Sequence, residues 1–218
     1  VDFANLTSAP SPQHLFGTDG NFRDVFSRVV FGARTSLAIG FAAIGFAFMF
    51  VEIAFIQKFT LFLSHPLYSV AITLSAFLIF AGLGSRYSGR RRGNIGTGVG
   101  PRHPLARPVL AICAIALLYL IALPPLFQLL APVQTLARFG ICAALVAPLA
   151  FAMGMPFPLG LGRVSARAEA LVPIAWGVNA SVSVVAAVLA TLLAIHLGFT
   201  VVLLLALLLY LAAAVAFP

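Results

Sequence analysis

Glu52 is a carboxylate inside a long apolar run. It is flanked by Val51 and Ile53, within a stretch rich in phenylalanine and alanine. On insertion scales a carboxylate near the middle of a membrane costs about 2.5–3.5 kcal/mol, and such groups usually face a bundle interior or a cavity. The position suggests a proton or cation relay. No second acidic residue lies in any apolar run, which favours the alternative of a structural carboxylate, protonated by burial.

A second pattern is a stripe of small and polar residues that recurs every four positions. Small residues let two helix backbones approach, and an amide can hydrogen-bond across the contact. We therefore interpret the stripe as a helix-packing surface rather than a ligand site, with Asn179, Ser183 and Thr191 as its polar members. The full stripe is Ala175, Asn179, Ser183, Ala187 and Thr191.

Prolines interrupt another apolar run at Pro148, Pro156 and Pro158. Proline removes a backbone donor and bends or ends a helix. Broken helices line binding sites in some transporters, but a helix end at the cytoplasmic interface is the simpler interpretation. These three prolines are the predicted helix-break positions.

A cluster of three arginines, Arg90, Arg91 and Arg92, precedes a glycine-rich run over residues 93–100. The run is not a phosphate-binding loop, because Pro101 and Pro104 follow it instead of a helix and no lysine occupies the required position. We interpret it as a linker. The arginines are candidates for contact with anionic lipid head groups.

The remaining reactive side chains do not form a catalytic set. The four histidines are scattered and lack metal-ligand spacing. Cys113 and Cys142 are expected roughly 20 Å apart in depth, which is too far for a disulfide. We predict no catalytic residue, no metal, no cofactor and no enzymatic activity.

Composition places these residues in a membrane. The chain has 218 residues, of which 62% are hydrophobic and 8% charged, against about 45–50% and 25% in an ordinary soluble domain. Such a chain lacks the polar surface for a water-soluble globule. We expect an all-α polytopic membrane protein, with the lipid bilayer as its main partner.

Apolar runs of about 20 residues match the thickness of the hydrocarbon core. They predict a transmembrane domain over residues 36–218, preceded by an extramembrane segment over residues 1–35. From Phe22 onward, apolar residues in the N-terminal segment recur with helical spacing, which indicates a short amphipathic helix, either at the membrane interface or packed on the rest of the protein. The six expected spans are 36–56, 66–84, 109–130, 139–158, 174–196 and 199–217.

The basic residues predict the orientation. If the connection over residues 85–108 is cytoplasmic, alternation of six spans puts 11 of the 13 lysines and arginines on that side, and only Lys58 and Arg138 outside. This asymmetry favours cytoplasmic termini and a bacterial-type inner membrane. It also explains the net charge of +8 without nucleic-acid binding.

Residues 14–37, HLFGTDGNFRDVFSRVVFGARTSL, resemble the segment before the second span of dipeptide and oligopeptide ABC-transporter permeases. The resemblance covers about residues 10–40 and departs at Phe22, where that family usually has glycine. The family's cytoplasmic coupling motif does not follow, since the single Glu-Ala pair, Glu169-Ala170, continues into Leu171-Val172-Pro173.

Residues from about 41 to 218 resemble the C-terminal membrane region of spermidine-synthase-like polytopic proteins. The resemblance implies a membrane part that is joined, in that family, to a soluble transferase domain, which these residues do not contain. It rests on the stretches at residues 45–66, 153–160 and 172–180.

Three functional hypotheses follow. The first is a non-catalytic integral membrane module that acts as an anchor or accessory subunit beside other integral membrane chains. The second is transmembrane transport, as a degenerate ABC-type permease or a small carrier. The third is the membrane part of a spermidine-synthase-like transferase whose soluble domain lies elsewhere.

Overall fold

The fold is all-α, and the computed structural model describes residues 9–10, 18, 24–94, 105–167 and 169–216. Helices fill nearly all of the three long described ranges, which agrees with the predicted polytopic membrane protein. The elements in chain order are α1 (Val25–Leu63), α2 (Pro66–Asn94), α3 (Ala106–Leu129), α4 (Thr135–Met153), α5 (Pro156–Arg167), the short 3-10 helix η1 (Glu169–Leu171) and α6 (Val172–Ala216).

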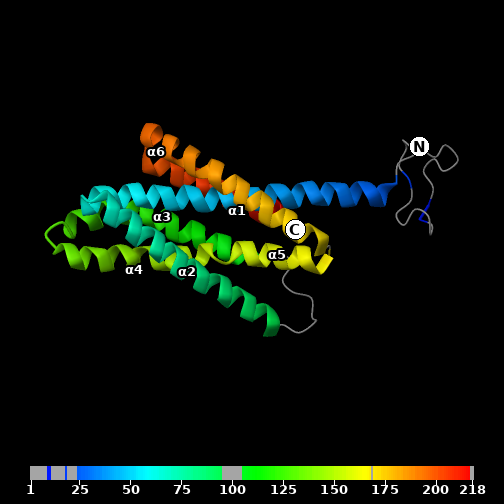
Figure 1. The fold of residues 1–218 in the computed structure, drawn as a ribbon, viewed down its shortest axis with the longest axis horizontal. Helices are drawn as coiled ribbons and strands as arrows, with labels where there is room; N and C mark the ends of the chain where they lie inside the picture. The colour runs from blue at the N-terminus through cyan, green and yellow to red at the C-terminus, as the bar shows by residue number, and fades with distance from the viewer. Residues whose placement is uncertain (1–8, 11–17, 19–23, 95–104, 168, 217–218) are drawn as a thin grey trace.

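Helix α1 forms the centre of the bundle. In the most apolar stretch of α1, 61% is buried, whereas only 28% of the corresponding stretch is buried in each of α2, α3 and α6. Figure 1 shows α6 crossing one side of α1, with α2, α3 and α4 gathered on the other side. The core is consequently built on α1, and the outer helices keep wide apolar faces, with Leu67, Ile121 and Val215 about four-fifths exposed. Apolar faces of this extent are suited to lipid.

The amphipathic helix and the first span were expected as separate elements. They form one continuous helix from Val25 to Leu63, in which the part that qualifies as a span is Thr35–Leu63. No proline or glycine turn separates the two parts, so backbone hydrogen bonding continues across the predicted boundary. Phe22, where the expected amphipathic pattern begins, lies outside the described residues.

Two other boundaries differ from the expectation. Helix α2 continues to Asn94, ten residues beyond the expected end at Gly84, so the arginine cluster belongs to a helix rather than to a loop. The expected span over residues 139–158 is interrupted, because α4 ends at Met153 and α5 begins at Pro156. Proline is favoured at the first position of a helix, where its missing N–H is not needed.

Five stretches of the described chain are long and apolar enough to cross a membrane: Thr35–Leu63, Pro66–Arg90, Ala106–Leu129, Thr135–Ala166 and Glu169–Ala216. The last has 48 residues, which at 1.5 Å per residue is more than twice the thickness of a hydrocarbon core. Inside it Gly198 has φ 83° and ψ 172°, a conformation that glycine adopts readily and other residues avoid. Figure 1 shows the chain of α6 turning back on itself part-way along its length.

The connections gather at two ends of the bundle. At one end the Arg138 guanidinium donates to the Phe62 carbonyl (3.4 Å) and Lys58 lies over the Phe199 ring (5.5 Å). These contacts bring together the end of α1, the start of α4 and the break in α6. The opposite end holds α5 and the last turns of α2 (Figure 1).

Candidate functional site

A cluster of aromatic rings surrounds α1 near one end of the bundle. The ring of Phe55 meets Phe77 of α2 at 6.2 Å, Tyr119 of α3 at 6.0 Å and Phe199 of α6 at 5.7 Å, all in edge-to-face geometry. Edge-to-face pairs at these distances are favourable beyond the area they bury. Phe55 therefore joins four helices at one point and fixes the position of its neighbours on α1.

Glu52 lies on the same face of α1 as Phe55, which follows it by three residues. Its side chain is 6% exposed, so the carboxylate expected in the membrane is buried inside the bundle. Lys58, six residues further along α1, lies over the Phe199 ring.

Tyr210 is the residue that sequence reasoning missed. It is fully buried, and its hydroxyl has no hydrogen-bond partner among the described residues. A buried polar group without a partner costs free energy, so an unpaired phenol in an aliphatic run marks an unusual position. The available signal was the tyrosine within the otherwise aliphatic residues 201–213.

Asn179 lies at the contact between α1 and α6. A Cβ atom added to Gly45 would be 2.9 Å from the Asn179 Oδ1 and 3.3 Å from the Ser183 Oγ. The glycine thus lets the two backbones approach, as expected for small residues in membrane helices. The Asn179 Oδ1 is buried and has no hydrogen-bond partner within the described chain.

The small-residue stripe turns away from α1 along the helix. Thr191 is exposed and its hydroxyl donates to the Ala187 carbonyl of its own helix, just as Ser183 donates to Asn179. A spacing of four residues advances 40° per step on a helix of 3.6 residues per turn, so its later members leave the contact. The residues that stay buried are Ala186, Ala190 and Ala194.

The helix-break prolines lie beside a second close contact, between α2 and α4. An added Cβ on Gly84 would overlap the Phe151 carbonyl, and one on Gly154 would overlap the Ala81 carbonyl. Gly154 occupies the break between α4 and Pro156. The sequence did not single out either glycine.

Pro148 lies inside α4, three residues after Leu145. The Leu145 carbonyl accepts a hydrogen bond from a neighbouring helix. The Tyr119 hydroxyl of α3 donates to the Leu145 carbonyl at 2.6 Å. The helical donor that Pro148 lacks would have bonded to the Ala144 carbonyl, four residues earlier, so the bond from Tyr119 falls on the neighbouring carbonyl and ties α3 to α4 beside the proline. Pro158 falls in the first turn of α5, where its effect is to start a helix rather than to bend one.

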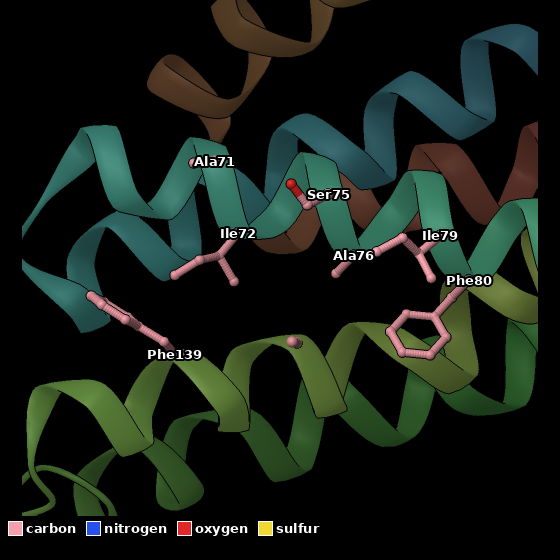
Figure 2. A pocket seen from close by; sticks show the side chains of 8 residues that line it. Ala71, Ile72, Ser75, Ala76, Ile79, Phe80 and Phe139 are labelled. Carbon is pink, nitrogen blue, oxygen red and sulfur yellow. The ribbon is translucent and has the colours of Figure 1, made fainter.

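Figure 2 shows a groove of about 470 Å³ between α2 and α4. Seven of its eight lining residues are apolar, and Ser75 is the exception. It is open along one side of the bundle rather than closed around a ligand, and the lining carries no charged group. The lining residues are Ala71, Ile72, Ser75, Ala76, Ile79, Phe80, Phe139 and Ala143.

The arginine cluster lies on the last turns of α2, and its contact with anionic lipid head groups stays a prediction. Arg90 is exposed on the last turns of α2, and Arg91 and Arg92 follow on the same helix. Cys113 is half-buried, Cys142 is buried, and both are free thiols. Within the described part of the chain no group of three histidine, cysteine or acidic side chains is arranged to hold a metal ion.

Comparison with known proteins adds a partial likeness to transport proteins. The chain is 34% identical over 89 residues to the dipeptide transport system permease protein DppC of Alkalihalophilus pseudofirmus, an alignment that covers 34% of this chain and 29% of that protein. It is 54% identical over 43 residues to the glutathione transport system permease protein GsiD of Escherichia coli, covering 20% of this chain and 14% of that protein. No protein-family profile and no solved structure matches the chain.

The chain therefore spans less than a third of the length of the curated relatives it matches. These likenesses agree with the expected resemblance to ABC-transporter permeases. The resemblance of residues 41–218 to spermidine-synthase-like membrane regions stays a prediction.

Proposed function

We propose that this chain is a non-catalytic, membrane-spanning subunit of a transport system and works beside other integral membrane chains. The observation that carries the proposal is the partial identity with two permeases, whose names assign them to dipeptide and glutathione transport. Small peptides are accordingly the proposed class of substrate for the whole assembly.

The sequence supports a subunit that does not couple to ATP by itself. The cytoplasmic Glu-Ala-Ala motif of the permeases is missing after residue 40, so the chain lacks the loop through which an ATPase acts on the spans. We propose that a segment outside these residues provides that coupling. The exposed large side chains of α2, α3 and α6 offer apolar faces on which a partner helix can pack in place of lipid.

We further propose that both termini lie in the cytoplasm of a bacterial-type inner membrane and that six spans cross it. The break at Gly198 supports counting α6 as two spans, and the exposed Arg86 and Arg90 at the end of α2 support a cytoplasmic location for that end. Lys58 and Arg138, at the opposite end, would then face outward.

The experiment is an uptake assay in cells from which the gene has been deleted. We expect uptake of labelled dipeptide or glutathione to fall and to return when the wild-type chain is supplied. A deletion strain that takes up both substrates at the wild-type rate refutes the transport role. Flux through proteoliposomes that contain the purified chain alone would refute the subunit role, because the chain would then be an autonomous carrier.

A second candidate function, a passive anchor or accessory module, is favoured by the tight helix contacts. The close approaches at Gly45, Gly84 and Gly154 bind α1 to α6 and α2 to α4, which suits a rigid platform for another protein. If the chain is an anchor, the deletion strain should take up peptides at the normal rate. One other membrane protein should then be missing from the membrane fraction of that strain.

A further inference from the structure

We propose that the groove between α2 and α4 binds one acyl chain of a phospholipid, with the lipid head group at the end of the groove where Tyr68 meets Phe139. Lipid binding at this groove is independent of the proposed transport function, because it can be measured without any transported substrate. Three observations support the site: the shape of the groove, its apolar lining, and the polar groups at one end of it.

The shape of the groove follows from the packing of the two helices. Their backbones touch at one level, where a Cβ added to Gly84 of α2 would overlap the Phe151 carbonyl of α4. The lining residues come earlier on both helices, where small side chains such as Ala76 and Ala143 leave space between them. The groove is therefore closed at the end with Gly84 and extends from there toward the start of both helices.

The dimensions of the groove suit a hydrocarbon chain rather than a helix. Its lining residues on α2 extend from Ala71 to Phe80, which at 1.5 Å per residue is about 14 Å, or roughly half of a hydrocarbon core about 30 Å thick. The groove thus has the length of one leaflet. A volume of about 470 Å³ over that length gives an average cross-section of about 35 Å², whereas a helix with its side chains, about 10 Å across, needs about 80 Å². One extended chain therefore fits along the groove, and a whole partner helix does not.

The lining selects an apolar occupant. Ile72 and Phe80 of α2 extend into the space that Phe139 of α4 enters from the other side (Figure 2). Ser75 is the single polar side chain of the lining, so a charged or strongly polar solute would lose its hydrogen bonds to water without replacement. A hydrocarbon chain loses none and gains dispersion contacts with the walls.

Amphipathic side chains mark the end of the groove away from Gly84. The Tyr68 ring lies 5.4 Å from the ring of Phe139 and 6.0 Å from the ring of His65. Tyr68 is about half exposed, and His65 is exposed in the connection between α1 and α2. Both side chains carry a hydrogen-bond donor, and tyrosine is enriched at the level of lipid head groups. A head group at this end would consequently meet donors as soon as its acyl chain leaves the groove.

Arg138 gives the same end of the bundle a positive charge. Its guanidinium donates to the carbonyls of Phe62 (3.4 Å) and Val133 (2.8 Å), which are neutral acceptors. A lipid phosphate is an anion that such a charge attracts. In the proposed orientation this end faces outward, so the lipid belongs to the outer leaflet, and only this assignment rests on the proposed orientation. The acidic residues of the described chain lie elsewhere, before α1, inside α1 and on η1: Asp24, Glu52 and Glu169.

Photolabelling of the full chain in vesicles of phosphatidylethanolamine and phosphatidylglycerol tests the site. The probe is phosphatidylglycerol with a diazirine in the middle of one acyl chain, and mass spectrometry of peptides locates the labelled residues. Ile121, which is 78% exposed on α3, reports ordinary contact with bulk lipid. We expect about threefold more label on the groove than on Ile121, a preference of about 0.7 kcal/mol. Equal label at both places would overturn the proposal, because the groove would then hold only boundary lipid. Less label in the groove would also overturn it, because another chain would then cover the groove.

A matched pair of substitutions on α4 tests the groove itself. Ala143→Phe fills the groove, so its label should fall to the level of Ile121, whereas Ala144→Phe adds the same ring at an exposed neighbouring position outside the lining and should leave the label unchanged. Ala71→Phe fills the groove from an exposed position on α2 and should act like Ala143→Phe without disturbing the core. Groove label that survives both filling substitutions would refute the site.

The position of the diazirine along the acyl chain tests the direction of the lipid. A diazirine close to the ester should label residues near Phe139, and one close to the terminal methyl group should label residues near Phe80. The reverse pattern would place the head group at the Gly84 end and would refute the role of Tyr68.

Discussion

Replacement of Gly84 by alanine should destabilise the bundle, whereas the same replacement at Gly82 should not. Both glycines lie in α2, two residues apart. A Cβ on Gly84 would overlap the Phe151 carbonyl of α4, while a Cβ on Gly82 would have no atom within 4 Å. Comparison of the two variants separates the effect of the α2–α4 contact on stability from the intrinsic preference of alanine for a helix.

The magnitude follows from two opposing terms. Alanine stabilises a helix by roughly 0.5–1 kcal/mol relative to glycine, and this gain applies to both variants. Overpacking a close contact costs about 1–3 kcal/mol, and this cost applies only to Gly84→Ala, where the overlapping atom is backbone. The gain common to both variants cancels, so we expect their free energies of unfolding to differ by about 1–3 kcal/mol, or roughly 5- to 150-fold in the unfolding equilibrium.

The assay is equilibrium unfolding in mixed detergent micelles, followed by far-UV circular dichroism and by the fluorescence of Trp176. This residue is the only tryptophan of the chain and its ring meets Phe157 of α5 at 4.7 Å, so its emission reports on packing close to Gly154. Coincident transitions of the two probes validate a two-state analysis. Equal stability of Gly82→Ala and Gly84→Ala would show that α2 and α4 do not meet at this glycine.

Three further predictions concern the aromatic cluster, the α3–α4 contact and the orientation. Phe55→Ala should lower the free energy of unfolding by about 3–5 kcal/mol, while Leu61→Ala, at a position 79% exposed, should leave it nearly unchanged in the same detergent titration. Tyr119→Phe should cost about 0.6 kcal/mol, the typical value of a hydrogen bond between membrane helices, and a larger loss measured by that titration would indicate a repacked core. A cysteine at Arg90 should react with an impermeant maleimide only from the cytoplasmic side and one at His65 only from outside; the opposite pattern would invert the proposed topology.

The sequence predicted the helical membrane fold because composition and run length are sufficient for that inference. Backbone groups must be satisfied within each segment in lipid, so apolar runs of suitable length leave only helices. Boundaries were harder to predict. The expected end of the second span followed from polarity, but Ser85–Asn94 remain helical, because polar residues do not end a helix that lacks a stop signal.

The candidate site was predicted in part. The burial of Glu52 and the contact made by Asn179 follow from single residues in apolar helices. The burial of Tyr210 could not be predicted, because it depends on how the chain folds back after Gly198. The close approaches at Gly84 and Gly154 depend in the same way on which helices become neighbours.

The central position of α1 has a consequence for biosynthesis. The ribosome completes α1 early, but the segment that contains Tyr210 is made about 150 residues later, a delay of roughly 8–30 s at ordinary rates of translation. During that interval Glu52 lies in a helix whose final neighbours do not yet exist, so α1 must wait near the insertion machinery or against lipid. Packing of α1 in the bundle therefore depends on the hairpin that contains Gly198, and chains truncated within it are expected to be recognised by membrane proteases.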